Sequence, residues 1–221
     1  DTLLYALRKP DEALAEYQRV LNDYAGVTDN VVRLAQLRVG DAYRTKGEYD
    51  KALVAYKKAA AMKTYQRPYT VQRVRRGAMA QSIEGYLARR QFAQAQQLLD
   101  LWGWEHPTDR IAGEWSLMAA KVARAKGEKE SALRDAVECA KANPRSPYAD
   151  RLLLLAAELH VELGRGDEAV ALVKRIQKDY PESAWQQKAA LVECRGLYDA
   201  KKRQDAARKA AEYYGKYAKG E

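Results

Sequence analysis

A basic stretch without acidic residues is the part of this sequence best suited to binding chemistry. No Asp or Glu occurs between Asp50 and Glu84, and Tyr56, Tyr65 and Tyr69 are interleaved with its basic residues. Basic side chains can hold phosphates and aromatic rings can stack on bases. An ordinary solvated basic face is the favoured interpretation, with an acidic protein surface or nucleic acid as the alternative partners. The patch would consist of Lys57, Lys58, Lys63, Arg67, Arg73, Arg75 and Arg76.

Residues with the spacing of a catalytic or metal site are scarce. The chain contains no glycine-rich phosphate loop and no nucleophile elbow. Two cysteines and two histidines make a poor ligand set for zinc. We therefore expect no enzyme activity, no cofactor and no metal ion in this segment.

Composition indicates an ordinary folded chain. Of its 221 residues, 47% are hydrophobic and 31% are charged, which is enough apolar material for a core and too much for intrinsic disorder. No apolar run reaches the ~18 residues that a membrane-spanning helix needs. The formal net charge of +9 comes from dispersed charges of both signs. It permits an acidic partner without requiring one.

A repeat of about 37 residues organises the chain. Its markers are prolines, alanines twelve residues before them, and turn residues five before the alanines. The central series comprises Pro107, Pro144 and Pro181 with Ala95, Ala132 and Ala169, and the turn residues Arg90, Gly127 and Gly164. The register extends to Ala13, Ala52 and Ala207, with Arg8, Gly47 and Lys202 as their turn residues.

Each unit has the pattern of two amphipathic helices. Apolar residues recur at intervals of three and four over residues 149–163, after which Gly164 favours the end of a helix. Ser146 followed by Pro147 predicts a helix start. We expect one domain over residues 1–221, with a truncated unit at 1–26 and full units at about 27–64, 65–107, 108–144, 145–181 and 182–221. Because the chain begins within a helical pattern, we expect it to be a fragment of a longer protein.

The unit around Ala52 resembles the tetratricopeptide repeat. The residues that carry this resemblance are Gly40, Tyr43, Gly47, Ala52, Tyr56 and Ala59. The units here are longer than the family's ~34 residues. Their proline-containing joints are similar to those of bacterial cell-envelope members of the superfamily. The resemblance implies an all-α fold, a right-handed α-solenoid of tandem antiparallel helix pairs.

The resemblance also implies a concave groove lined by the first helix of each unit. Transferring the groove positions through the alanine register gives a basic or mixed first half and an acidic second half. The residues expected to bind a partner there are Arg38, Asp41, Arg44, Glu84, Lys121, Arg124, Glu158 and Glu162, with Glu193 and Asp199 further along. Family members that clamp a carboxyl terminus use Lys and Asn. This chain has three asparagines, all near helix ends, so we expect no such clamp.

The favoured function is therefore a non-catalytic scaffold that binds a partner peptide or helix in the groove. Two alternatives stay open. The chain could be a helical-repeat nucleic-acid binder that uses residues 51–76, or a module that positions a catalytic or anchoring domain outside this segment. The joints favour a periplasmic or cell-envelope location over the cytoplasm, although unpaired Cys139 and Cys194 favour a reducing compartment.

Overall fold

The chain folds into helices joined in consecutive pairs. A computed structural model describes residues 2–27, 30–62 and 68–217, and leaves out the side chains of residues 5, 30, 60, 68–75 and 111–112. The chain divides into two compact units, Asp1–Leu98 and Leu99–Glu221, called unit 1 and unit 2 below. No strand occurs in the described ranges, and the expected all-α repeat fold is confirmed. The single domain over residues 1–221 stays a prediction.

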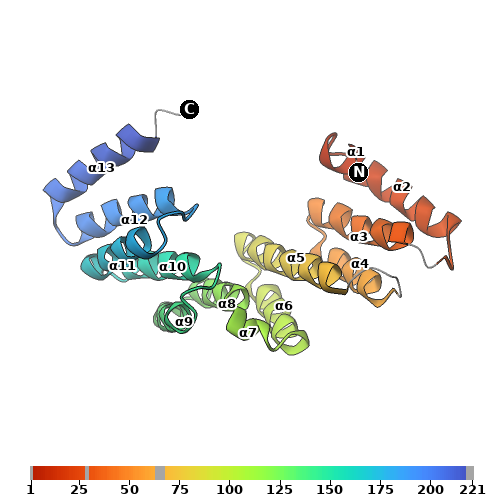
Figure 1. Cartoon of the computed structure of the whole chain (residues 1–221), viewed down its shortest axis with the longest axis horizontal. Coiled ribbons are helices and arrows are strands. Elements are labelled where there is room, and N and C mark those ends of the chain that lie inside the picture. Colours follow the sequence, from red (N-terminus) through yellow and green to blue (C-terminus); the bar gives the residue numbers. More distant parts are fainter. Residues whose placement is uncertain (1, 28–29, 63–67, 218–221) are drawn as a thin grey trace. The chain divides into compact units, whose positions relative to one another are not determined.

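Unit 1 contains a short helix paired with a long one, then one pair of long helices and the start of a further pair (Figure 1). A short helix precedes the first long one, and α6 crosses the boundary between the units. The helices are α1 (Thr2–Tyr5), α2 (Pro10–Asp23), α3 (Asn30–Thr45), α4 (Tyr49–Ala61), α5 (Pro68–Ala88) and α6 (Phe92–Glu105).

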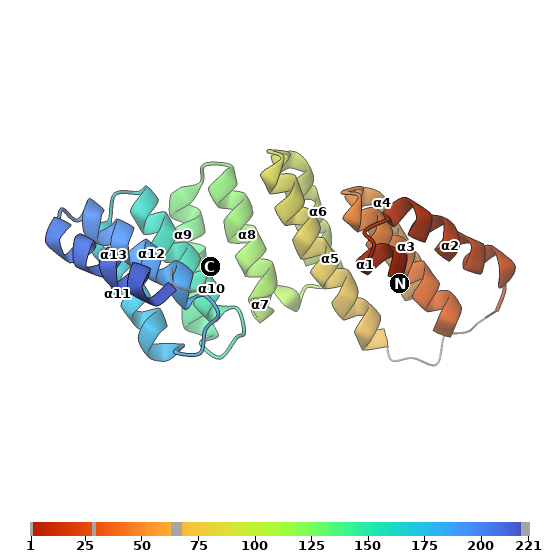
Figure 2. The same cartoon turned by 90° about the horizontal axis from the view of Figure 1, so that it is seen from above.

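Unit 2 continues the same alternation of first and second helices. A short helix, α7 (Asp109–Ala112), is separated from α8 by Gly113, whose φ is 96°. Figure 2 shows α8 and α9 side by side and joined by a short turn. The remaining helices are α8 (Glu114–Ala125), α9 (Lys129–Ala142), α10 (Ala149–Glu162), α11 (Gly166–Asp179), α12 (Gln186–Asp199) and α13 (Arg203–Tyr217).

One residue with positive φ lies in each tight turn between the helices of a pair. Glycine adopts this conformation without a clash at Gly47, Gly127 and Gly164, whereas Arg8 and Arg90 adopt it despite their Cβ atoms. In the last pair the residue is Lys201, with φ of 60°, and not the expected Lys202.

In the last repeat, the alanine at the contact between the two helices is therefore Ala206. Ala207, the residue expected from the sequence, is exposed, whereas Ala206 is 8% exposed. Five residues separate each turn residue from a buried alanine, which lets the two helices of a pair approach closely. The corrected spacing from Ala169 to Ala206 is 37 residues, the same as in the two preceding repeats.

The last two joints between successive pairs contain serine-centred turns. The expected helix start at Ser146 is wrong, because α10 begins at Ala149. Ser146 Oγ instead accepts a hydrogen bond from the Tyr148 backbone N–H at 3.2 Å. One repeat later, Ser183 Oγ accepts from the Trp185 N–H at 3.1 Å. Both joints thus present an aromatic side chain just before a first helix.

Candidate functional site

In unit 1 the predicted groove residues of α3 form a network around a buried carboxylate. Asp41 is 5% exposed. Arg38 Nη1 lies 2.9 Å from its Oδ2, Arg44 Nη2 lies 3.5 Å from its Oδ1, and Tyr56 donates its hydroxyl to Oδ1 at 2.7 Å. The two guanidinium charges are therefore balanced in part within the same helix pair.

The first helix of the next pair, α5, joins this network through a neutral side chain. Arg44 also donates to the side-chain carbonyl of Gln81 on α5. Glu84, predicted as a groove residue, is exposed one turn further along α5. On the groove face of unit 1, Arg38, Asp41 and Arg44 therefore lie together, with both arginines in contact with the carboxylate.

In unit 2 the predicted basic and acidic groove residues pair across successive repeats. Arg124 on α8 donates from Nη1 to Glu158 at 2.6 Å and from Nε to Glu162 at 2.8 Å, both on α10. Lys188 Nζ lies 2.6 Å from the other oxygen of Glu158, and Lys129 Nζ lies 2.9 Å from Glu162. The structure therefore interleaves the charges that the sequence suggested were separated along the groove.

These contacts set the charge state of the network. Burial pushes the pKa of Glu162 upward, but the hydrogen bonds from Lys129 and Arg124 outweigh it and lower this pKa below its ordinary value. Burial likewise opposes the charged form of Arg124, and the hydrogen bonds to Glu162 and Glu158 raise its pKa overall. Both partners are therefore charged at neutral pH.

A hollow of about 90 Å³ opens beside this network on the first helices of unit 2. We call it the groove hollow. Three leucines and a tryptophan form its apolar part, and four cations and one acid form the rest. It is lined by Leu117, Lys121, Arg124, Arg151, Leu154, Leu155, Glu158, Trp185 and Lys188.

Arg151, which no sequence pattern had singled out, occupies a distinctive place in the groove hollow. Its guanidinium carbon lies 5.1 Å from the centre of the Trp185 ring and 5.7 Å from that of Tyr148. Within the described part of the chain this guanidinium forms no ion pair. The spacing Tyr148-x-x-Arg151, repeated as Trp185-x-x-Lys188, is the sequence signal that could have identified it.

The predicted basic patch is only partly visible. Lys57 and Lys58 are exposed on α4, and Arg76 is half-exposed on α5. Tyr56 is fully buried, with its hydroxyl on Asp41, so it offers no ring to a base. Lys63 and Arg67 lie outside the described residues, as do the side chains of Arg73 and Arg75.

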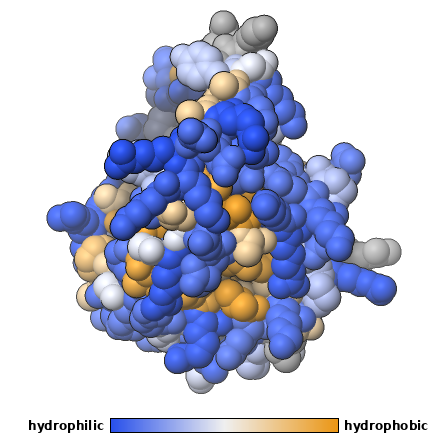
Figure 3. Space-filling model, turned by 90° about the vertical axis from the view of Figure 1, so that its left-hand side faces the viewer, coloured by the Kyte–Doolittle hydropathy of each residue, from blue (hydrophilic) through white to orange (hydrophobic). Residues whose placement is uncertain are grey.

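Larger hollows occur in both units. In unit 1, a hollow of about 410 Å³ is lined by α2, α3 and α4, including Leu21, Val39 and Val54. In unit 2, α10, α12 and α13 line a mostly apolar hollow of about 560 Å³ that includes Tyr198, Ala207 and Ala210. Figure 3 shows hydrophobic residues surrounded by hydrophilic ones on the side of the molecule that carries the C-terminal helices.

The described ranges contain neither a candidate metal site nor a candidate membrane span. Their His, Cys, Asp and Glu residues form no group of three or more that could hold a metal ion. None of the helices described is both long and apolar enough to cross a bilayer. His160 is half-buried, and burial lowers its pKa below the ordinary value.

Comparison with known proteins found a matching family model and a solved structure with a similar fold. Residues 123–192 match the family model of the tetratricopeptide repeat. Sequence comparison with curated proteins gave no match. The fold is similar to the crystal structure of a signal transduction ATPase with numerous domains, which carries a tetratricopeptide repeat sensor, from Pyrococcus horikoshii. The TM-score is 0.61 at 13% sequence identity, over 94% of this chain and 34% of that one.

This likeness concerns the fold alone, and the chain spans about a third of the length of the archaeal protein. The family model and the fold nevertheless agree with the helix pairs, the tight turns and the buried alanines described above. The resemblance to the tetratricopeptide repeat superfamily is therefore confirmed, with residues 123–192 as the segment that the family model identifies.

Proposed function

We propose that this chain is a non-catalytic scaffold whose groove hollow binds a carboxylate of an acidic segment in a partner protein. Tetratricopeptide repeats generally mediate protein–protein interaction or scaffolding. The observation that supports the acidic partner is Arg151, whose guanidinium lines the groove hollow against Trp185 and forms no ion pair within the described chain.

The charges around the groove hollow favour an anion. Lys121, Arg124, Arg151 and Lys188 line it, and the acid among its lining residues is Glu158. Arg124 and Lys188 already hold the two oxygens of that acid. A carboxylate from a partner would therefore meet an excess of cations, and the planar guanidinium of Arg151 can hold it through two parallel hydrogen bonds.

The size of the groove hollow suits a single side chain rather than a whole peptide. Its volume of about 90 Å³ is less than a quarter of that of the hollow of about 410 Å³ in unit 1. One carboxylate fits this space, and the rest of an extended partner would lie along α8, α10 and α12. In this arrangement Arg124 orients Glu158 and Glu162, and Arg151 with Lys121 contacts the partner.

A binding experiment with Arg151→Ala tests this proposal. The probe is a fluorescein-labelled oligoglutamate peptide, with oligoglutamine as the uncharged comparison, and anisotropy measures the affinity. Loss of a charge-assisted hydrogen bond should weaken oligoglutamate binding by about tenfold. The matched control is Arg134→Ala on α9, whose side chain is 64% exposed. Equal weakening by both variants would show that only net charge matters and would refute a specific hollow.

The nucleic-acid alternative has less support from the described residues. Tyr56 is buried and offers no ring to a base, and the described members of the basic patch are Lys57, Lys58 and Arg76. A labelled single-stranded oligonucleotide in the same assay distinguishes the two functions. Affinity that falls steeply between ~50 and 200 mM salt, and that Arg151→Ala leaves unchanged, would favour nucleic acid. The cell-envelope location stays a prediction.

A further inference from the structure

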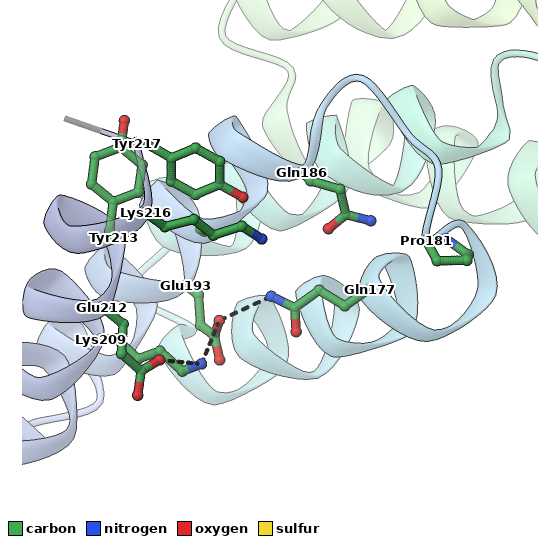
Figure 4. A pocket seen from close by; sticks show the side chains of 10 residues that line it. Gln177, Pro181, Gln186, Glu193, Lys209, Glu212, Tyr213, Lys216 and Tyr217 are labelled. Atoms are coloured by element: carbon green, nitrogen blue, oxygen red, sulfur yellow. Dashed lines mark hydrogen bonds and ion pairs between the residues drawn. The ribbon is translucent and has the colours of Figure 1, made fainter. Parts of the chain in front are cut away.

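A second polar hollow lies on a different face of α12 from the groove hollow. Helical geometry places Gln186, Ala190 and Glu193 on one face of α12, with Lys188 about 160° away around the axis. Helices α11 and α13 complete this second hollow, which has a volume of about 390 Å³ and which we call the tyrosine hollow (Figure 4). It is lined by Gln177, Pro181, Gln186, Ala190, Glu193, Lys209, Glu212, Tyr213, Lys216 and Tyr217.

A buried carboxylate forms part of its lining. Glu193 is 2% exposed. Gln177 Nε2 donates to its Oε2 at 3.1 Å, and Lys209 Nζ lies 3.7 Å from the same oxygen but only 3.1 Å from Glu212 (Figure 4). Within the described chain no group donates to Glu193 Oε1. The negative charge is therefore incompletely balanced, which is costly for a buried group.

The repeat fold does not require a carboxylate at this position. Glu193 precedes its repeat alanine, Ala206, by thirteen residues. The corresponding residues of the other repeats carry no charge: they are Val39, Ser82, Ala119 and Ala156. Packing of the first helix against its neighbours is therefore achieved without charge elsewhere, and the acid at 193 calls for another explanation.

Aromatic rings near this carboxylate are suited to holding a cation. The ring centres of Tyr213 and Tyr217 lie 5.1 Å apart on α13. The ammonium of Lys216 lies 5.0 Å from the centre of the Tyr217 ring. Attraction between a cation and the face of an aromatic ring explains this position. Because Lys216 is exposed, a cation from outside can compete for the same ring.

We propose that the tyrosine hollow binds one basic side chain, lysine or arginine, of a protein partner. Its charged group contacts Glu193 Oε1, and its aliphatic stem lies along Tyr213 and Tyr217. The inference is independent of the groove hollow, because the two hollows share no lining residue. A partner with an acidic residue and a basic residue could engage both faces of α12.

NMR titration of the whole chain with Nα-acetyl-arginine amide tests the proposal. Chemical-shift changes should concentrate on α11, α12 and α13, and the uncharged analogue Nα-acetyl-citrulline amide should cause none. Glu193→Gln keeps an acceptor for Gln177 but removes the charge, and should weaken arginine-amide binding by about tenfold. The control Glu138→Gln changes an exposed acid on α9 and should leave the affinity unchanged.

Lys216→Ala gives the opposite and more specific expectation. Removal of the resident ammonium from the Tyr217 ring should strengthen arginine-amide binding by about twofold. If Lys216→Ala weakens arginine-amide binding, the Lys216 ammonium does not compete with the ligand for the Tyr217 ring, and the proposal is wrong. The proposal also fails if citrulline amide binds as well as arginine amide, or if arginine amide causes no shifts at saturating concentration. Oligoglutamate binding at the groove hollow is unaffected in any of these cases, so the two proposals fail separately.

Discussion

Each unit contains a hollow at the same place in the repeat, and the surface of this hollow is more apolar in unit 1 than in unit 2. The position thirteen residues before the repeat alanine is Val39 in the α3–α4 pair of unit 1 and Glu193 in the α12–α13 pair of unit 2. Both are nearly inaccessible, at 5% and 2% exposure. The neighbours differ accordingly, because Leu21 and Ala55 in unit 1 occupy the positions of Gln177 and Lys209 in unit 2.

This difference shows which property belongs to the repeat and which to the individual residue. The turn and the buried alanine place a first helix between two second helices and leave a space of similar size, about 410 and 390 Å³. Side chains at a few register positions then decide whether that space is apolar or polar. One backbone arrangement can therefore serve packing in one unit and recognition in the other.

Tryptophan fluorescence offers a way to separate the two units experimentally. All four tryptophans of the chain, Trp102, Trp104, Trp115 and Trp185, lie in unit 2. Trp102 is fully buried and donates to Asp109 at 2.7 Å, so its environment changes on unfolding. Urea titrations followed by fluorescence report on unit 2, and far-ultraviolet circular dichroism reports on both units.

Val39→Glu should have the largest effect, because it buries a carboxylate where unit 1 has apolar neighbours. We expect the free energy of unfolding of unit 1 to fall by about 3 kcal/mol. Circular dichroism should show an earlier transition, and the tryptophan transition should keep its midpoint. A loss below about 1 kcal/mol would mean that Lys51 or Lys58, which also line this hollow, reaches the new charge. The hollow in unit 1 would then accommodate a buried carboxylate as the hollow in unit 2 does.

Substitutions at the turn residues give a smaller effect, whose sign depends on whether the native turn residue is glycine. Gly127 has a φ of 90° and no atom within 4 Å of the place of an added Cβ. Gly127→Ala should therefore lower the free energy of unfolding of unit 2 by about 1 kcal/mol through backbone strain alone. Arg90→Gly should raise that of unit 1 by less, because glycine also loosens the unfolded chain. Urea midpoints by fluorescence and circular dichroism measure the two changes.

Glu193→Val should have the smallest effect on stability. Replacing a buried, incompletely paired charge by an apolar side chain is often neutral or stabilising, so we expect a change below about 1 kcal/mol. The tryptophan transition in urea measures it. A loss of about 3 kcal/mol or more would show that Glu193 is a structural requirement of unit 2, and would make the comparison with Val39 one of folding rather than of function.

The fold was largely predictable because its signals are local and repeated. Glycine at 127 and 164 and alanine five residues later identify turn and contact together. In the last repeat, the predicted turn residue and alanine were each one residue too late, because Ala206 and Ala207 are adjacent and no glycine marks the turn at Lys201. Burial distinguishes the two alanines, and burial depends on the packed structure.

The candidate site was less predictable because its contacts join residues one repeat apart. Arg124 was predicted to bind a partner, yet it holds Glu158 and Glu162, which lie 34 and 38 residues later. Arg151 was missed because its place depends on the ring of Trp185 in the next joint. A search for opposite charges about one repeat apart would have found the first arrangement but not the second.

The spacing of the positive-φ turn residues also has a consequence for how such a chain can change its length. From Arg90 onward these residues recur at 127, 164 and 201, always 37 residues apart. Gain or loss of 37 residues within this region joins equivalent positions and preserves every turn. Duplication of a gene segment of that size would lengthen the array by one complete helix pair, and each new pair could diverge at a single position such as 193 to acquire a different ligand.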